Sequence, residues 1–159
     1  MAQVTEGQTL PEIRLSRSFP ARRATVFKAW SSADQVKRWF CPAGFSIPEA
    51  KVQMRVGGAF EVCMRSAEGV DYWTRGRFTE VAPFDRLVIE MDAIGEGDRR
   101  FFTAHTVVTF AEDPTGTRME VVQTYTMHDV AGLPMVQGAP QGWIQTLDRL
   151  QAELARPQD

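Results

Sequence analysis

The best candidate for proton transfer is a histidine next to a carboxylate, His128 followed by Asp129. An imidazole changes charge near neutral pH, so a histidine at the mouth of a pocket can act as a general base. Adjacent residues in a loop rarely bond to each other, which favours a structural role for the pair. Tyr125, three residues earlier, is a second and weaker candidate. His105 lies in a strand pattern that points it away from the apolar side, as a solvent-facing histidine does.

Metal and nucleophile chemistry find little support in the sequence. Two distant histidines, without HExxH or Cys/His spacing, do not predict a metal site. The sequence contains no GxSxG, GxxxxGK or GxGxxG motif, so we expect no cofactor and recognise no catalytic motif. Cys63 shares the outward parity of its strand with Glu61 and Arg65, and a single thiol without a basic partner is usually inert. We expect Cys41 and Cys63 to be free thiols, because they lack CxxC spacing.

Three arginines bear on whether a ligand would be anionic. Arg17 has the parity of the apolar residues in its strand, so its guanidinium must find a carboxylate, backbone carbonyls or an anion. We expect a structural partner. Arg75 and Arg77 share one face of a long strand, and the opposite face carries Tyr72, Gly76 and Phe78. The pattern leaves open which face is inward, and only an inward arginine face would favour an anionic ligand.

Composition narrows the class of protein. The chain has 159 residues, 43% hydrophobic and 24% charged, which fits one globular domain with an ordered core over about 11–156. A formal net charge of −2 without a basic run argues against nucleic acid as a partner. The sequence has neither an 18-residue apolar stretch nor a signal-peptide pattern, so we expect no membrane insertion and a cytoplasmic location.

Hydrophobic periodicity predicts an α+β fold with an antiparallel sheet. Residues 12–19 alternate with period two, and helical spacing follows in two short segments near 21–30 and 33–40. Ser31 or Ser32 is the expected N-cap of the second helix. From about residue 47 to residue 127, alternating segments separated by glycine- and proline-rich turns add six strands, which makes seven in all.

The last segment is strongly amphipathic. Trp143, Leu147, Leu150 and Leu154 are spaced four, three and four residues apart, as on one face of a helix. Because proline is tolerated only in the first helical turn, Pro140 places the regular helix at about 138–155. This helix is the only long element available to cover the apolar face of the sheet.

The widths of these elements predict a cavity. One helix is about 10 Å wide, whereas seven strands at about 4.8 Å spacing span roughly 30 Å. Large inward side chains either fill the remaining space or line it for an apolar ligand, and the sequence leaves both alternatives open. The candidate ligand-binding residues are Trp39, Phe40, Phe45, Phe60, Met64, Thr106, Phe110, Tyr125, Trp143 and Leu147.

Several segments, in this order along the chain, are similar to those of one family: 17–21, 26–30, 39–40, 55–58, 80–88, 108–110 and 142–150. Together they resemble the activator-of-heat-shock-ATPase-like (AHSA-like) family of the START/SRPBCC superfamily, over nearly the whole chain. The resemblance implies a helix-grip fold, in which a seven-stranded curved antiparallel sheet wraps around a long C-terminal helix and two short helices join strands 1 and 2. Relatives include lipid carriers, cyclases and co-chaperones, so the fold alone does not set the function.

Three functions follow as hypotheses. The first is a binding module that takes a small apolar or amphipathic molecule between Trp143 and the sheet, without turnover. The second is a cyclase- or hydrolase-type enzyme that uses the same pocket, with His128 or Tyr125 transferring a proton. The third is a co-chaperone-like interaction domain with a chaperone partner, or a homodimer, that uses the outer face of the sheet. Val88, Val107 and Val122 are the only hint of an apolar patch there.

Overall fold

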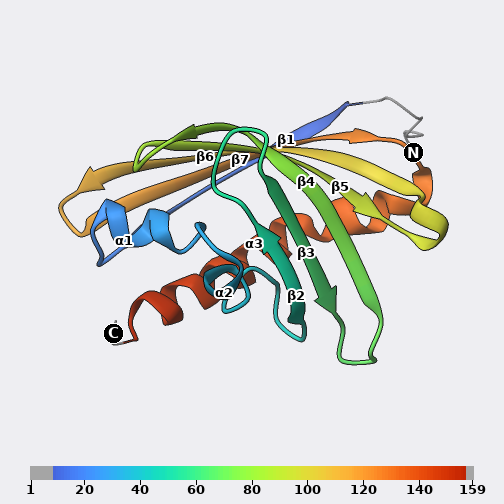
Figure 1. Ribbon diagram of the computed structural model, residues 1–159, viewed down its shortest axis with the longest axis horizontal. Helices are drawn as coiled ribbons and strands as arrows, with labels where there is room; N and C mark the ends of the chain where they lie inside the picture. The colour runs from blue at the N-terminus through green and yellow to red at the C-terminus, as the bar shows by residue number, and fades with distance from the viewer. Residues whose placement is uncertain (1–8, 157–159) are drawn as a thin grey trace.

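The computed structural model describes residues 9–156 and shows a strongly curved sheet with every helix on its concave side (Figure 1). The strands are β1 (Thr9–Phe19), β2 (Ser46–Val52), β3 (Ala59–Arg65), β4 (Asp71–Ala82), β5 (Arg86–Ile94), β6 (Arg100–Asp113) and β7 (Gly116–Met127). The α-helices are α1 (Arg23–Lys28), α2 (Ala33–Val36) and α3 (Leu133–Leu154), and two 3₁₀ turns are η1 (Glu96–Asp98) and η2 (Val130–Gly132).

The sheet is a seven-stranded antiparallel meander with one rearrangement. Its strand order is β1-β7-β6-β5-β4-β3-β2, so consecutive strands are neighbours except that β1 pairs with the last strand. Alternation along β6 and β7 buries one parity of side chains and leaves the other half-buried or exposed. The predicted α+β class, the seven strands and the helix-grip arrangement are confirmed.

Local signals position the two short helices. The Ser32 hydroxyl caps α2 by accepting a hydrogen bond from the backbone N–H of Gln35 at 3.2 Å. Trp30 and Trp39 pack edge to face with their ring centroids 4.8 Å apart, and the indole of Trp39 donates to the carbonyl of Ala29. The segments that follow the two helices thus pack together as one aromatic cluster against the sheet and the second half of α3.

The predicted start of the long helix is wrong. Helix α3 begins at Leu133, so Pro140 lies inside the helix and not in its first turn. Pro134 occupies the favourable first turn, and Val136 is buried against the sheet. Pro140 is exposed, and packing of the apolar stripe on both sides of it holds the helix together despite the missing N–H.

The interior divides into two apolar clusters. The larger one joins α1, α2 and the second half of α3 to the sheet, with Trp30, Phe60 and Leu150 among its members. The smaller one lies under the first half of α3 and contains Ala93, Phe102, Ala104, Tyr125, Met127 and Val136. The space between these clusters is where a cavity would be expected.

Candidate functional site

A pocket of about 470 Å³ lies where the two apolar clusters meet. We call it the inner pocket. Strands β3 to β7 supply Met64, Tyr72, Thr74, Met91, Ala93, Phe102, Ala104, Gln123 and Tyr125. Helix α3 and the segment after α2 supply Phe40, Pro42, Phe45, Pro134, Met135, Gly138, Ala139, Gly142, Trp143 and Thr146. None of these lining side chains, all within the described residues, carries a charge.

Small residues on facing surfaces explain why this space is open. On the sheet, Ala93 and Ala104 take positions where neighbouring strands carry large side chains. On the helix, Gly138, Ala139 and Gly142 face them. Protein interiors otherwise pack to near-crystalline density. Where the side chains are short on both the sheet and the helix, the two surfaces do not meet and a gap remains.

The inward face of β4 is the one without arginines. Tyr72 and Thr74 line the inner pocket, and Phe78 is buried farther along the same face. Arg75 lies on the opposite face, where its guanidinium stacks over Trp73 at 4.8 Å from the ring centroid. The alternative that the sequence left open is thereby resolved against an anion site lined by arginines.

A buried polar cluster forms part of the pocket wall. The side-chain oxygen of Gln123 accepts hydrogen bonds from the Tyr125 hydroxyl and from the Trp143 indole, the latter at 3.0 Å. The Gln123 amide nitrogen donates to the Thr106 hydroxyl on β6 at 2.8 Å. Because an indole N–H can only donate, its partner must be the amide oxygen, which fixes the orientation of the Gln123 side chain. The cluster thus ties α3 to the centre of the sheet.

Burial raises the pKa of the Tyr125 hydroxyl well above its ordinary value. The cause is desolvation, which penalises the phenolate. Tyr125 is therefore neutral and a hydrogen-bond donor to Gln123 across the physiological pH range. This state suits a wall residue better than a general base.

Five of the ten candidate ligand-binding residues line the inner pocket: Phe40, Phe45, Met64, Tyr125 and Trp143. The other five are buried elsewhere. Trp39, Phe60, Phe110 and Leu147 belong to the packed larger cluster, and Thr106 lies behind Gln123. Alternation identified inward side chains but did not separate those at the gap from those in the packed core. The ligand-binding role of all ten remains a prediction.

His128 lies outside the lining of the inner pocket. Its Nε2 is 2.7 Å from the Thr103 hydroxyl, which donates in turn to Asp92 at 2.5 Å. The neighbouring Asp129 caps η2 through the N–H of Ala131 and forms an ion pair with Arg99. Both residues of the sequence pair therefore bond to other partners and not to each other.

The other side chains singled out in the sequence do not line the inner pocket. Arg17 forms an ion pair with Asp148 of α3 at 2.7 Å, which is the expected structural carboxylate. Both cysteines are free and buried, and burial raises the pKa of the Cys41 and Cys63 thiols. His105 is exposed on the outer face of β6. Among the described residues, no three His, Cys, Asp or Glu side chains gather as a metal site would require.

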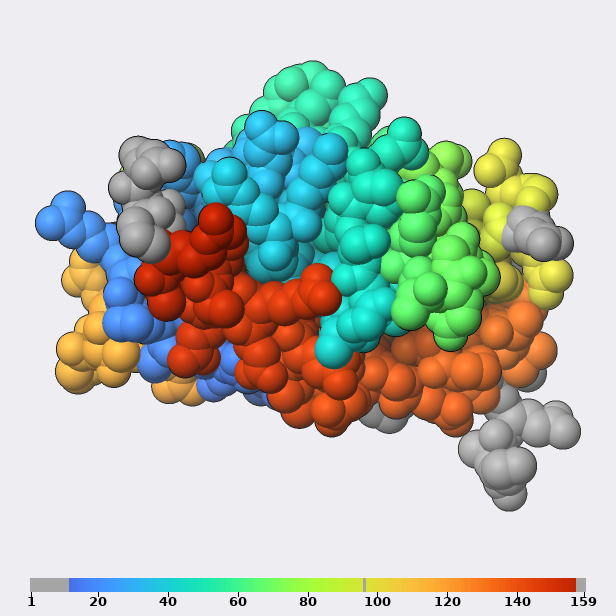
Figure 2. Space-filling model, turned by 90° about the horizontal axis from the view of Figure 1, so that it is seen from below, coloured from blue at the N-terminus to red at the C-terminus, as the bar shows by residue number. Residues whose placement is uncertain are grey.

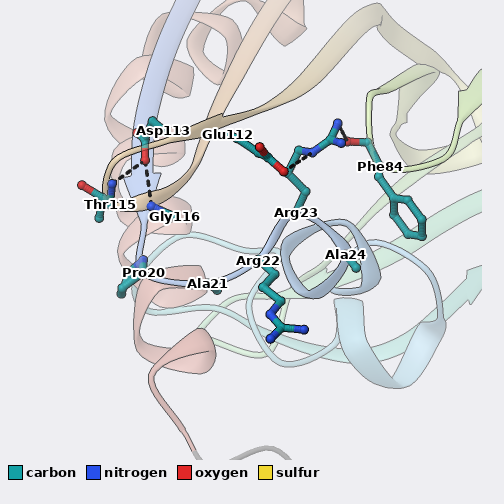
Figure 3. Close-up of a pocket in the computed structure, with 10 residues that line it drawn as sticks. All are labelled: Pro20, Ala21, Arg22, Arg23, Ala24, Phe84, Glu112, Asp113, Thr115 and Gly116. Atoms are coloured by element: carbon teal, nitrogen blue, oxygen red, sulfur yellow. Dashed lines mark hydrogen bonds and ion pairs between the residues drawn. The ribbon is translucent and has the colours of Figure 1, made fainter.

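A second depression, of about 640 Å³, lies at the β6–β7 turn and the start of α1 (Figure 3). Its Arg23 and Asp113 side chains already have partners. Arg23 donates to the carbonyl of Phe84 at 3.1 Å and forms an ion pair with Asp85, while Asp113 accepts from the backbone N–H groups of Thr115 and Gly116, both at 2.9 Å. Figure 3 shows Arg22 directed away from these contacts. The depression is best understood as a structural junction.

Comparisons with known proteins agree with this architecture. A family model described as Activator of Hsp90 ATPase homolog 1-like protein matches residues 20–155. A solved protein from Chromobacterium violaceum is 26% identical, with a TM-score of 0.79 over 92% of this chain and 98% of that one. A solved protein from Nitrosomonas europaea is also 26% identical, with a TM-score of 0.73 over 90% of this chain and 92% of that one. No curated protein matches the chain. None of the described helices is long and apolar enough to span a membrane.

Proposed function

The chain belongs to the family of Activator of Hsp90 ATPase homolog 1-like proteins, and from this premise we propose that it binds a small apolar molecule in the inner pocket without turning it over. The observation that carries the proposal is a gap of about 470 Å³ between two packed clusters, walled by uncharged and largely apolar side chains. Small-molecule sites typically enclose about 300–1,000 Å³ and combine such walls with a few polar groups.

The route into the pocket supports this proposal. Tyr72 on β4 and Met135 on α3 both line the pocket and are 37% and 36% exposed, so apolar side chains reach from the interior to the surface. Seen from below, the first half of α3 runs past the β3–β4 hairpin (Figure 2). A ligand that enters here would bury apolar surface. Each Å² buried contributes about 25 cal/mol of favourable free energy, which is a sufficient source of affinity.

The test is a titration with a neutral fluorescent probe, N-phenyl-1-naphthylamine. We expect saturable binding at one site per chain. The variant Ala104→Leu adds bulk inside the pocket and should weaken binding at least about tenfold, because the added methyl groups occupy the ligand's space. The matched control Ala111→Leu makes the same change at an exposed position of the same strand and should leave binding unchanged. Equal binding by the two variants would place the probe elsewhere.

The two alternative functions have less support. For an enzyme, Tyr125 is the proton-transfer candidate that lines the pocket, and its hydroxyl is already bonded to Gln123. For an interaction surface, Val88, Val107 and Val122 do lie side by side across β5, β6 and β7. Val88 is only 5% exposed, however, so the row offers little apolar surface to a chaperone or to a second copy of the chain.

A further inference from the structure

The lining of the inner pocket differs in composition from the core around it. The packed core contains many branched aliphatic side chains, Leu87, Ile89, Val108 and Leu150 among them. Among the described residues that line the pocket there is no leucine, isoleucine or valine. The lining has six aromatic residues and three methionines instead: Phe40, Phe45, Tyr72, Phe102, Tyr125 and Trp143, with Met64, Met91 and Met135. Apart from two prolines and several small residues, its apolar side chains are therefore all aromatic rings or thioethers.

The aromatic side chains of the wall pack in pairs. Their three edge-to-face pairs have ring centroids between 5.4 and 6.0 Å apart: Phe102 with Tyr125, Phe40 with Trp143, and Phe45 with Tyr72. The first pair joins β6 to β7, the second joins α3 to the segment after α2, and the third lies at β4, so rings border the gap on several sides. Aromatic rings attract one another beyond the area that they bury, because the negative face of one ring meets the positive edge of another. An aromatic ligand would gain this attraction from more than one side.

Hydrogen bonds hold two of these rings in place before any ligand binds. The side-chain oxygen of Gln123 accepts from the Tyr125 hydroxyl and from the Trp143 indole, the latter at 3.0 Å. Both side chains are also buried. A wall that is already ordered loses little conformational freedom on binding, so the attraction between rings is not cancelled by the cost of ordering them.

The three methionines add a second interaction that depends on aromaticity. Met64 lies on β3, Met91 on β5 and Met135 on α3, so thioethers reach the pocket from both the sheet and the helix. A methionine sulfur interacts favourably with an aromatic ring, often at the edge of the ring, and its unbranched side chain can adjust to the ring's position. A saturated ligand would gain neither the ring–ring nor the sulfur–ring attraction.

Building on the proposed function, we infer that the inner pocket selects aromatic ring systems over saturated molecules of the same carbon skeleton and polarity. The short side chains of Ala93 and Ala104, with Gly142 on the helix, leave the space between the rings and thioethers for such a ligand. Apolar character and volume alone do not require this selectivity. Judged by area, a saturated ring system would bind at least as tightly, because it buries at least as much apolar surface.

Two primary alcohols with the same carbon skeleton test this selectivity by calorimetric titration: 2-naphthalenemethanol and its saturated counterpart, decahydro-2-naphthalenemethanol. Both carry the same hydroxymethyl group, so the polar side chains of the wall do not distinguish them. We expect the aromatic alcohol to bind at least about tenfold more tightly, as a few ring–ring and sulfur–ring contacts provide. A saturated alcohol that binds as tightly as the aromatic one, or more tightly, would overturn the inference.

A double variant tests whether the wall causes the preference. Phe45→Leu combined with Met64→Leu replaces one ring and one thioether of the lining by branched aliphatic side chains. Both positions are only partly buried, so we expect the variant to fold. The preference for the aromatic alcohol should fall at least about threefold, while the affinity for the saturated alcohol should change less than that. A preference that the folded variant retains in full would contradict the inference.

The matched control makes the same two changes outside the inner pocket. Met54 packs against the larger cluster and Phe84 is 46% exposed, and neither lines the pocket. Met54→Leu combined with Phe84→Leu should leave the preference unchanged. An equal fall in both double variants would show that the selectivity does not come from the pocket wall, which would also overturn the inference. If the pocket variant does not fold, the ranking of the two alcohols by the unmodified protein still decides.

The outcomes also distinguish this inference from the function on which it depends. If neither alcohol binds, the proposed function fails together with the inference. If both bind equally tightly, the pocket is a binding site for apolar molecules without the selectivity, and only the inference fails.

Discussion

Gln123 is the residue on which the centre of the molecule most depends. Its side-chain oxygen accepts hydrogen bonds from one strand and one helix at once, from Tyr125 on β7 and from Trp143 on α3. The sequence indicates that Gln123 points inward, because it has the same parity as Val121 and Tyr125. Its partnership with Trp143 was not predictable, since it depends on how α3 is rotated over the sheet.

Replacing Gln123 by leucine should be strongly destabilising. The change leaves the Tyr125 hydroxyl and the Trp143 indole without an acceptor, and each unsatisfied buried donor costs about 1–3 kcal/mol. We expect the free energy of unfolding, measured by urea denaturation, to fall by about 2–5 kcal/mol. The control Tyr125→Phe removes one of the donors together with its need for a partner, and should cost less. Equal losses in the two variants would contradict this account.

The raised pKa of Tyr125 predicts instability in alkali. In the unfolded chain a tyrosine ionises near pH 10, whereas the folded protein keeps this phenol neutral to a higher pH. The stability that the neutral, buried Tyr125 contributes is therefore fully present below the unfolded-state pKa. It is lost as the pH rises through the folded-state pKa. Unfolding free energy should therefore decrease above about pH 10.

The measurement uses the absorbance of the phenolate. In a Tyr72→Phe background, Tyr125 is the one remaining tyrosine, so its ionisation can be followed directly. Phenolate absorbance should appear together with the loss of circular dichroism and not before it. Ionisation at an alkaline pH where the protein remains folded would show that the hydroxyl is more accessible than its burial indicates.

At the level of elements, the first half of α3 is the least expected part of the fold. The predicted start of the helix was too late because Pro140 was expected in its first turn, and Gly138 and Gly142 are also poor helix formers. Tertiary packing overrides this local preference, because Val136 before Pro140 and Trp143 after it are both buried. The sequence predicted the strands more accurately, since period-two alternation and glycine turns are local features.

Gly138→Ala should stabilise the protein. A Cβ added at Gly138 meets no atom within 4 Å, so the methyl group fits without a clash. Alanine lowers the conformational entropy of the unfolded chain and favours the helix, which is worth about 0.4–1 kcal/mol. Thermal denaturation should show a small rise in Tm. A fall in Tm would mean that the helix needs the flexibility of glycine at this position.

Gly76→Ala should have the opposite effect. Here a Cβ would lie 1.8 Å from the carbonyl oxygen of Glu90 on the neighbouring strand, and that backbone cannot move aside easily. We expect a loss of about 1–3 kcal/mol in unfolding free energy, as for other overpacked sites. The absence of a side chain at Gly76 permits the close approach of β5. A neutral effect in the same denaturation assay would contradict this contact.

Over the whole molecule, the cavity follows from the mismatch between a wide sheet and one narrow helix, and its position follows from small residues. The existence of a cavity could be predicted from the number of strands. Its position could not, because Ala104 and Gly142 come from distant parts of the chain and only the folded structure shows that both border one gap. The resulting molecule has two apolar clusters that share one sheet and one helix.

A ligand in the inner pocket should therefore act as packing between the two clusters. At a free ligand concentration of 100 times the Kd, binding raises the free energy of unfolding by about 2.7 kcal/mol. Locally, we expect amide hydrogen exchange to slow most in the first half of α3. Two glycines and a proline weaken the helix there, and the empty pocket leaves its inner face without packing partners. N-phenyl-1-naphthylamine is the probe, and Ala104→Leu, which fills the same space, is the control and should respond little. Slowing that is uniform along α3, with Gln141 no different from Gln151, would show that the ligand stabilises the fold as a whole and does not bridge its two parts.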